Sequence, residues 1–178
     1  MTDTAFGPAF LESAQFRFES LKSLGDRAMA QLSPKDLHWS PDAETNSIAV
    51  LIQHLRGNMR SRWTDFLTTD GEKPWRDRDG EFTADPSCLR DELLNLWDEG
   101  WACCLDALRA LTPDDLAREV TVRGQALGVL DAIERQHSHY AYHVGQIVLL
   151  ARMRCGADWQ TLSIARGQSM AYRPTKRD

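Results

Sequence analysis

Long amphipathic segments, separated by clusters of turn-forming residues, run through most of this chain of 178 residues. Within each segment the apolar residues recur three or four positions apart, which is the spacing of one face of an α-helix. The sequence predicts four long helices, over about residues 8–32, 47–67, 86–111 and 127–154, and no convincing run of strands. Because each helix must bury its apolar face against other helices, we expect an all-α fold, a four-helix bundle.

Capping residues indicate where these helices begin and end. Asn46 is a good N-cap for the second helix, and the pair Asp85-Pro86 is typical of the start of a third. Gly156 is the expected stop of the last helix. Between the third and last helices, residues 119–124 are expected to form a short extended turn-back.

The connection between the second and third helices, from Thr68 to Asp85, is unusually long for a helical bundle. Antiparallel neighbours need about two to eight connecting residues, whereas crossing back along a helix of about 30 Å takes at least nine or ten extended residues. We therefore expect a crossover that leaves the second and third helices parallel. Trp75 and Phe82 in this polar loop must pack on something, so the segment from Asp70 to Phe82 is a candidate lining for the mouth of a site.

The formal charge of −5 argues against a nucleic-acid-binding surface, which normally shows as a basic face or stripe. No stretch approaches the eighteen or so apolar residues of a membrane span, and the first residues lack the pattern of a secretory signal. We expect one cytoplasmic domain over residues 1–178, with a polar tail from about residue 166 and neither nucleic acid nor membrane as a partner.

Four cysteines occur, at Cys88, Cys103, Cys104 and Cys155, without the spacing of a zinc ribbon or a thioredoxin-type motif. In a cytoplasmic protein such thiols are expected to be reduced. Cys103 and Cys104 fall on a predicted helix, where free cysteine behaves as a small buried hydrophobe.

Three histidines, His137, His139 and His143, lie within seven positions of the last helix. At about 100° per residue, His139 and His143 project within about 40° of each other, whereas His137 points roughly 160° away from His139. Arg135 and Gln146 share the face of the pair. A polar stripe on an otherwise apolar helix needs partners if it is buried, so His139 and His143 are candidate ligands and His137 is not.

A further histidine, His54, lies among apolar residues of the second helix and has Asn58 and Asp65 on its face. Facing the pair on the last helix, it would complete a three-histidine set with positions left for water or substrate, as in reactive metal sites. Asn58 is a candidate pocket residue. Asp65 is a candidate base or outer-shell acceptor by type, but about three turns from His54 it is expected to lie too far away for either role. Spacing alone leaves open that these are ordinary hydrogen-bonded histidines. His38, in a loop, is expected to have no functional role.

The residues around these histidines resemble the DinB/YfiT-like superfamily of metalloenzymes. The resemblance rests on His54, on the phrase HYAYHVGQI with its HxxxH pair, and on the preceding TVRGQALGVLDAI. The phrases HLRGNMRSRW and TDGEKPWRDRDGEF further resemble a bacterial sub-branch of unknown function. This resemblance covers nearly the whole chain. It implies a bundle with up-down-down-up wiring and a divalent metal, most often zinc or nickel, on His54, His139 and His143.

Characterised members of that superfamily include thiol-dependent S-transferases and a mycothiol-dependent maleylpyruvate isomerase. The resemblance therefore implies a metal-dependent enzyme that activates the thiol of a low-molecular-weight cofactor, or a water molecule. Arg135 is a candidate for steering an anionic carboxylate, with a structural ion pair as the equally good alternative. Gln146 is a candidate outer-shell residue.

A second hypothesis is a non-catalytic, metal-binding stress-response protein that acts as a homodimer. Aromatic residues anchor many protein interfaces, and this chain has tryptophans that could serve there. The alternative for the same residues is ordinary core packing. The tryptophans considered are Trp63, Trp75, Trp97 and Trp101.

Overall fold

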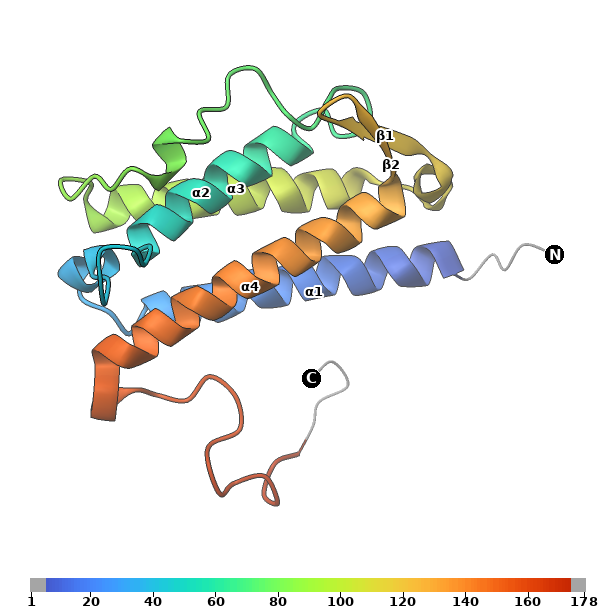
Figure 1. Ribbon diagram of the computed structural model, residues 1–178. Coiled ribbons are helices and arrows are strands. Elements are labelled where there is room, and N and C mark those ends of the chain that lie inside the picture. Colours follow the sequence, from blue (N-terminus) through green and yellow to red (C-terminus); the bar gives the residue numbers. More distant parts are fainter. Residues whose placement is uncertain (1–5, 174–178) are drawn as a thin grey trace.

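The computed structural model describes residues 6–173 and confirms an all-α helical bundle (Figure 1). The long helices are α1 (Phe6–Met29), α2 (Ile48–Trp63), α3 (Arg90–Ala110) and α4 (Val129–Cys155). The strands β1 (Glu119–Val122) and β2 (Gln125–Gly128) pair antiparallel as a hairpin. Short 3-10 helices span Pro34–His38, Gly80–Phe82, Pro113–Ala117 and Gly156–Asp158. A helix able to span a membrane is not found among residues 6–173.

The helices run up-down-down-up, with α1 and α4 pointing one way and α2 and α3 the other (Figure 1). The crossover predicted from the length of the loop is therefore present. The connecting segment leaves the end of α2, passes along the outside of the bundle and returns to the end at which α2 began (Figure 1). This path carries a polar loop alongside α2, where it can reach the side chains of that helix.

The second helix differs at both ends from its predicted limits. Its N-cap is Ser47, whose Oγ accepts the Val50 N–H at 3.3 Å, and not the neighbouring Asn46. It ends at Trp63, four residues early, and Asp65 beyond it has a φ of 51°. A residue in this left-handed region cannot continue a right-handed helix.

The third helix begins at Arg90, later than the Asp85-Pro86 pair predicted. Asp85 instead closes a turn, because its Oδ1 accepts the N–H of Ser87 at 3.0 Å and the O–H of the same residue at 2.6 Å. Glu92 takes over the capping role: its Oε2 accepts the Leu89 N–H at 2.7 Å.

The turn-back expected at residues 119–124 is the β1–β2 hairpin, so α4 begins after β2, at Val129. The expected stop is also found: Gly156 has a φ of 55° at the C-terminal end of α4. Of the polar tail predicted from about residue 166, residues 166–173 are exposed, and residues 174–178 lie outside the described part of the chain.

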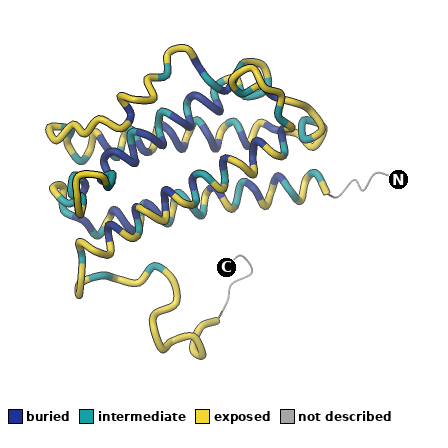
Figure 2. The backbone as a smooth tube through the Cα atoms, viewed as in Figure 1, coloured by how far each residue is buried: buried dark blue, intermediate teal, exposed yellow. Residues whose placement is uncertain are grey.

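The core lies between the helices (Figure 2), and its buried aromatic residues are Phe18, Trp63, Trp97, Trp101 and Tyr140. Trp63, Trp97 and Trp101 are at most 2% exposed, so they pack in the core and cannot form an interface. Trp75 is 51% exposed and lies beside Arg60, with the guanidinium carbon 5.2 Å from the ring centroid.

The cysteines of the described chain are free. Cys104 is fully buried as expected, whereas Cys103 is only half-buried, with its Sγ 3.6 Å from Thr64 Oγ1. Burial raises the pKa of both thiols. They are therefore protonated at neutral pH, which is unfavourable for a nucleophile.

Gly25 lies inside α1 because the helix packs closely on a tryptophan. A Cβ at this position would lie 2.6 Å from Cζ2 of Trp97. We expect Gly25→Leu to lower the free energy of unfolding by about 2–3 kcal/mol through overpacking, measured by urea denaturation. Gly145→Ala on the exposed side of α4, where a Cβ would meet nothing within 4 Å, should instead raise it by about 0.5–1 kcal/mol. Equal effects of the two would contradict this account.

Candidate metal centre

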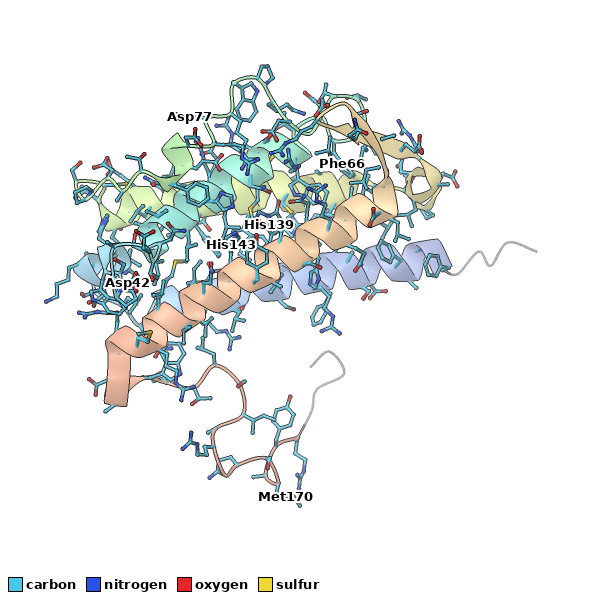
Figure 3. The ribbon with its side chains drawn as sticks, viewed as in Figure 1. Asp42, Phe66, Asp77, His139, His143 and Met170 are labelled. Carbon is cyan, nitrogen blue, oxygen red and sulfur yellow. The ribbon has the colours of Figure 1, made fainter. Side chains whose placement is uncertain are left out.

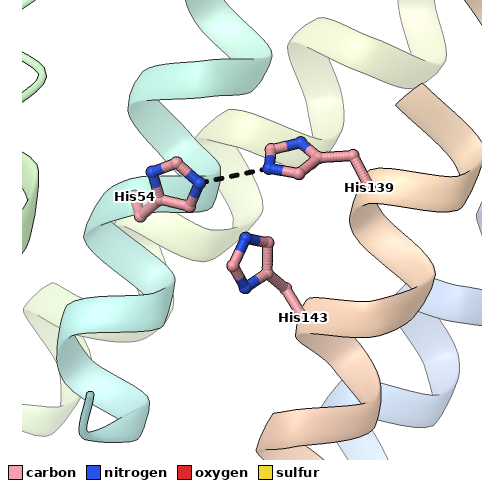
Figure 4. Close-up of side chains that lie close together, drawn as sticks. All are labelled: His54, His139 and His143. Carbon is pink, nitrogen blue, oxygen red and sulfur yellow. Dashed lines mark hydrogen bonds between the residues drawn. The ribbon is translucent and has the colours of Figure 1, made fainter. Parts of the chain in front are cut away.

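The three histidines singled out in the sequence meet between α2 and α4. His139 and His143 project from α4 toward α2 (Figure 3), and His54 faces them from α2 (Figure 4). One ring nitrogen from each lies within 4.8 Å of the others, and the Nε2 atoms of His54 and His139 are 3.2 Å apart. The cluster is compatible with a metal site.

The other histidines lie elsewhere. The ring of His137 is 5.5 Å from the ring of Phe18 on α1, as the helical phase predicted for a residue pointing away from the pair. His38 places its Nε2 3.0 Å from the carbonyl oxygen of Cys88, which ties two loops together. Neither residue approaches the cluster.

The outer nitrogen of His54 is held by a carboxylate. Its Nδ1 lies 3.0 Å from Oε2 of Glu81, which is 8% exposed. Burial acts to raise the pKa of Glu81, but hydrogen bonds from Arg76 and His54 outweigh it and leave the pKa below its usual value. An ionised carboxylate only accepts hydrogen bonds, so His54 donates from Nδ1, which leaves Nε2 as the ring nitrogen that faces the other histidines.

His143 is held in the same manner by a neighbour on its own helix. Its Nδ1 lies 2.9 Å from Oε1 of Gln146, one turn further along α4. Its Nε2 is buried and has no hydrogen-bond partner among the described residues. A buried polar atom without a partner costs free energy, and a divalent cation bound by the three imidazoles would remove that cost.

The histidines of α4 resist protonation. Burial, followed by the neighbouring His143 and His54, lowers the pKa of His139 to about 3. Burial likewise lowers the pKa of His143 to about 4, although Gln146 acts in the opposite direction. Both rings are therefore neutral at physiological pH, the form in which imidazole binds a metal.

The remaining predicted site residues divide into two groups. Asn58 and Arg135 line a cleft of about 370 Å³ that also exposes His54 and His139. Gln146 holds His143. Asp65 does not join them, because α2 ends before it and its side chain lines a separate hollow with Phe66 and Leu67.

Asn58 also connects the two helices of the site. Its Oδ1 accepts the hydroxyl hydrogen of the fully buried Tyr140 at 3.1 Å, and the Tyr140 oxygen accepts from Trp63 Nε1 at 2.9 Å. Because every member of this buried chain has a partner, it holds α2 and α4 in one relative position.

Two residues of the crossover loop belong to the site, although the sequence signalled them only weakly. Glu81 is the partner of His54, and the Phe82 ring stacks on His54 with centroids 4.7 Å apart. The segment Asp70 to Phe82 was a candidate lining because Phe82 is apolar within a polar loop. Nothing in the sequence distinguished Glu81 from the other acidic residues of that segment.

Gly57 allows the crossover loop to approach α2. A Cβ on Gly57 would lie 2.1 Å from Oε1 and 2.6 Å from Cδ of Glu81, so Gly57→Ala must displace this carboxylate from His54. We expect metal affinity to fall by about 10–100-fold, the usual effect of losing an outer-shell partner, as measured by competition with a chelating dye. Adding Gly57→Ala to a Glu81→Ala variant should cause no further loss; an additional loss of the same size would contradict the route through Glu81.

Comparison with known proteins places the chain in a family without an assigned activity. The family described as Protein of unknown function (DUF1572) matches residues 5–168. No curated protein and no solved structure matches the chain.

Proposed function

The chain belongs to the family Protein of unknown function (DUF1572), and from the site built between α2 and α4 we propose that it is a divalent-metal-dependent enzyme. In this proposal His54, His139 and His143 hold the ion, with zinc or nickel as the expected metal. The reaction class is that of a thiol-dependent S-transferase, in line with the resemblance of the histidine motifs to the DinB/YfiT-like superfamily.

One observation supports a metal more than any other. Within residues 6–173 the Nε2 of His143 is buried without a hydrogen-bond partner, beside the facing Nε2 atoms of His54 and His139. Meanwhile the opposite ring nitrogens of His54 and His143 are engaged by Glu81 and Gln146. Histidines that bind metals typically donate their second ring N–H to a carboxylate or carbonyl in this way, which orients the ring.

The arrangement suits catalysis better than a closed structural site. Three imidazoles leave at least one coordination position, and a bound metal would lower the pKa of a thiol or water to give a nucleophile near neutral pH. His54 and His139 also line the cleft of about 370 Å³, a volume within the range of small-molecule sites. Asn58 and Arg135 line the same cleft and are placed to position a substrate.

The test has two stages. Elemental analysis of the purified protein should find about one divalent ion per chain, as expected for one three-histidine site. Thiol-transfer assays with bacillithiol, mycothiol and glutathione against a panel of electrophiles should then give turnover that a chelator abolishes. Protein that carries no metal after incubation with zinc or nickel would overturn the proposal at its first stage.

A full metal site without turnover with any thiol would instead favour a non-catalytic metal-binding protein. The tryptophans lend that alternative little support, because Trp63, Trp97 and Trp101 lie in the core. The homodimer remains a prediction, to be measured by sedimentation.

A further inference from the structure

The cleft beside the histidines is lined by arginines from four separate parts of the chain. Arg62 comes from α2, Arg76 and Arg78 from the crossover loop, Arg123 from the hairpin turn and Arg135 from α4. No aspartate or glutamate of the described residues lines it. The chain as a whole has a formal charge of −5, so this concentration of positive charge runs against its composition.

Tertiary contacts bring these arginines together. Asp70 on the crossover loop accepts the backbone N–H groups of Arg123 at 2.9 Å and Gly124 at 2.7 Å. Arg62 Nη1 donates to the carbonyl oxygen of Gly71. The hairpin, the loop and α2 are thereby joined at one edge of the cleft.

The carboxylates around the cleft do not balance the arginines. Glu72 pairs with Arg62 at 3.1 Å and with Arg123 at 3.0 Å. Glu81 pairs with Arg76 at 2.7 Å and is also bonded to His54. Three arginines thus share two carboxylates, and Asp70 beside the hairpin turn adds a third negative charge, so the positive excess of the cleft comes from the remaining two arginines.

Arg78 and Arg135 form no ion pair within residues 6–173. Asp77, which precedes Arg78 in the chain, is directed elsewhere, since it lines a different hollow and accepts the N–H of Gly80 at 3.0 Å. The structural ion pair considered for Arg135 is therefore not formed. Both guanidinium groups are free to bind a ligand.

A deeper arginine also has unused hydrogen-bonding capacity. The Arg76 side chain is 1% exposed, and its Nη1 is buried without a hydrogen-bond partner among the described residues; Glu72 Oε1, at 3.9 Å, is too far. The charge itself is paired with Glu81, but a buried N–H group left without an acceptor is costly. Arg76 lines the cleft, and a small shift of its side chain would bring this donor within reach of an oxyanion bound there.

We propose that the small molecule that reacts at the three-histidine centre carries two or more oxyanion groups, carboxylate or phosphate, which these arginines bind. This inference rests on the proposed function and names its substrate class. Arg78 and Arg135 bind one group at the exposed side, and Arg76 binds another deeper in the cleft. The planar guanidinium matches carboxylate and phosphate oxygens in a bidentate manner, and the adjoining His54 and His139 place the reacting atoms next to the bound anion.

Calorimetric titration of the purified protein tests this, with acetate, succinate, propane-1,2,3-tricarboxylate and inorganic phosphate at constant ionic strength. Succinate or the tricarboxylate should bind about tenfold or more tightly than acetate, because each added charge-assisted hydrogen bond contributes roughly that factor. Inorganic phosphate that binds as tightly as the di- and tricarboxylates would show that a single oxyanion group is enough, and would overturn the requirement for two. Equal, weak affinity for all four would overturn it.

Matched variants locate the binding. The double variant Arg78→Gln, Arg135→Gln should bind the preferred anion about tenfold or more weakly than the wild type. Arg152 is exposed on α4 outside the cleft, so Arg152→Gln should leave this affinity unchanged. Equal losses in both would mean non-specific attraction and would refute the proposal. Bound metal, measured by elemental analysis, should be unchanged in the double arginine variant.

The His139→Ala variant separates this inference from the metal. Anion affinity that survives in it within about tenfold would support binding by arginine, and affinity that disappears would assign the anion to the ion instead and refute the arginine site. A protein that binds metal but shows no anion preference would contradict this inference alone. One that prefers anions but never binds metal would contradict the proposed function.

Discussion

Replacing His139 by alanine is expected to reduce bound metal from about one ion per chain to nearly none, since the set would lose one of three ligands. The affinity should fall by more than the roughly 10–100-fold that follows from losing an outer-shell partner. Elemental analysis of the purified variant measures this directly. The fold should remain intact, because the ring is only half-buried and belongs to no buried ion pair, and circular dichroism checks that it does.

His137→Ala is the matched control, because the residue lies two positions away on the same helix. Its ring packs near Phe18, with ring centroids 5.5 Å apart, and not at the cluster. Metal content should therefore stay nearly unchanged. Stoichiometric metal in the His139→Ala protein, or equal losses in the two variants, would exclude the three-histidine site.

Arg76→Ala is expected to be among the most destabilising single changes, lowering the free energy of unfolding by about 3–5 kcal/mol. The guanidinium is 1% exposed and donates to both oxygens of Glu81, at 2.7 and 2.8 Å. Without it a buried carboxylate loses its main partner and the crossover loop loses its attachment beside α2. Urea denaturation measures the change. The affinity for the metal should fall as well, because Glu81 orients His54.

A double variant distinguishes the cost of the unpaired charge from the value of the pair. Arg76→Met combined with Glu81→Leu removes both charges and keeps apolar volume, and buried ion pairs replaced in this way often lose little stability. We expect the double variant to be more stable than Arg76→Ala alone, yet to bind metal about 10–100-fold more weakly than the wild type, since the partner of His54 is gone. A double variant less stable than the single would contradict this account.

Much of the fold could be predicted because it depends on local pattern and on the reach of the chain. The apolar period identified the long helices, and the length of the loop before Asp85 predicted that α2 and α3 run parallel. The helix ends were less accurate. Asn46 and Ser47 are both good N-caps, so the sequence could not decide between them, and the structure uses Ser47.

The candidate site was predictable to a similar extent. His139 and His143 share a face because they are four residues apart, and His54 was conspicuous as a polar residue on an apolar helix. Asp65 was included on the same reasoning, but α2 ends before it. Helical phase holds only as far as the helix does, so the prediction failed there.

By itself, the sequence determined which side chains share a helix face, since that depends only on the fixed rotation per residue. It thereby determined the pair His139 and His143 and the exclusion of His137. His54, on another helix, was predicted from its apolar surroundings and from the family resemblance. Only the tertiary structure decided which nitrogen of each ring faces the centre and which carboxylate holds His54. Those outcomes depend on the path of the crossover loop. This loop brings Glu81 next to His54, in the space left by the missing side chain of Gly57. The tertiary structure also decided the arginine-lined cleft. Packing gathers its residues from four segments of the chain, and no periodicity in the sequence relates these segments to one another.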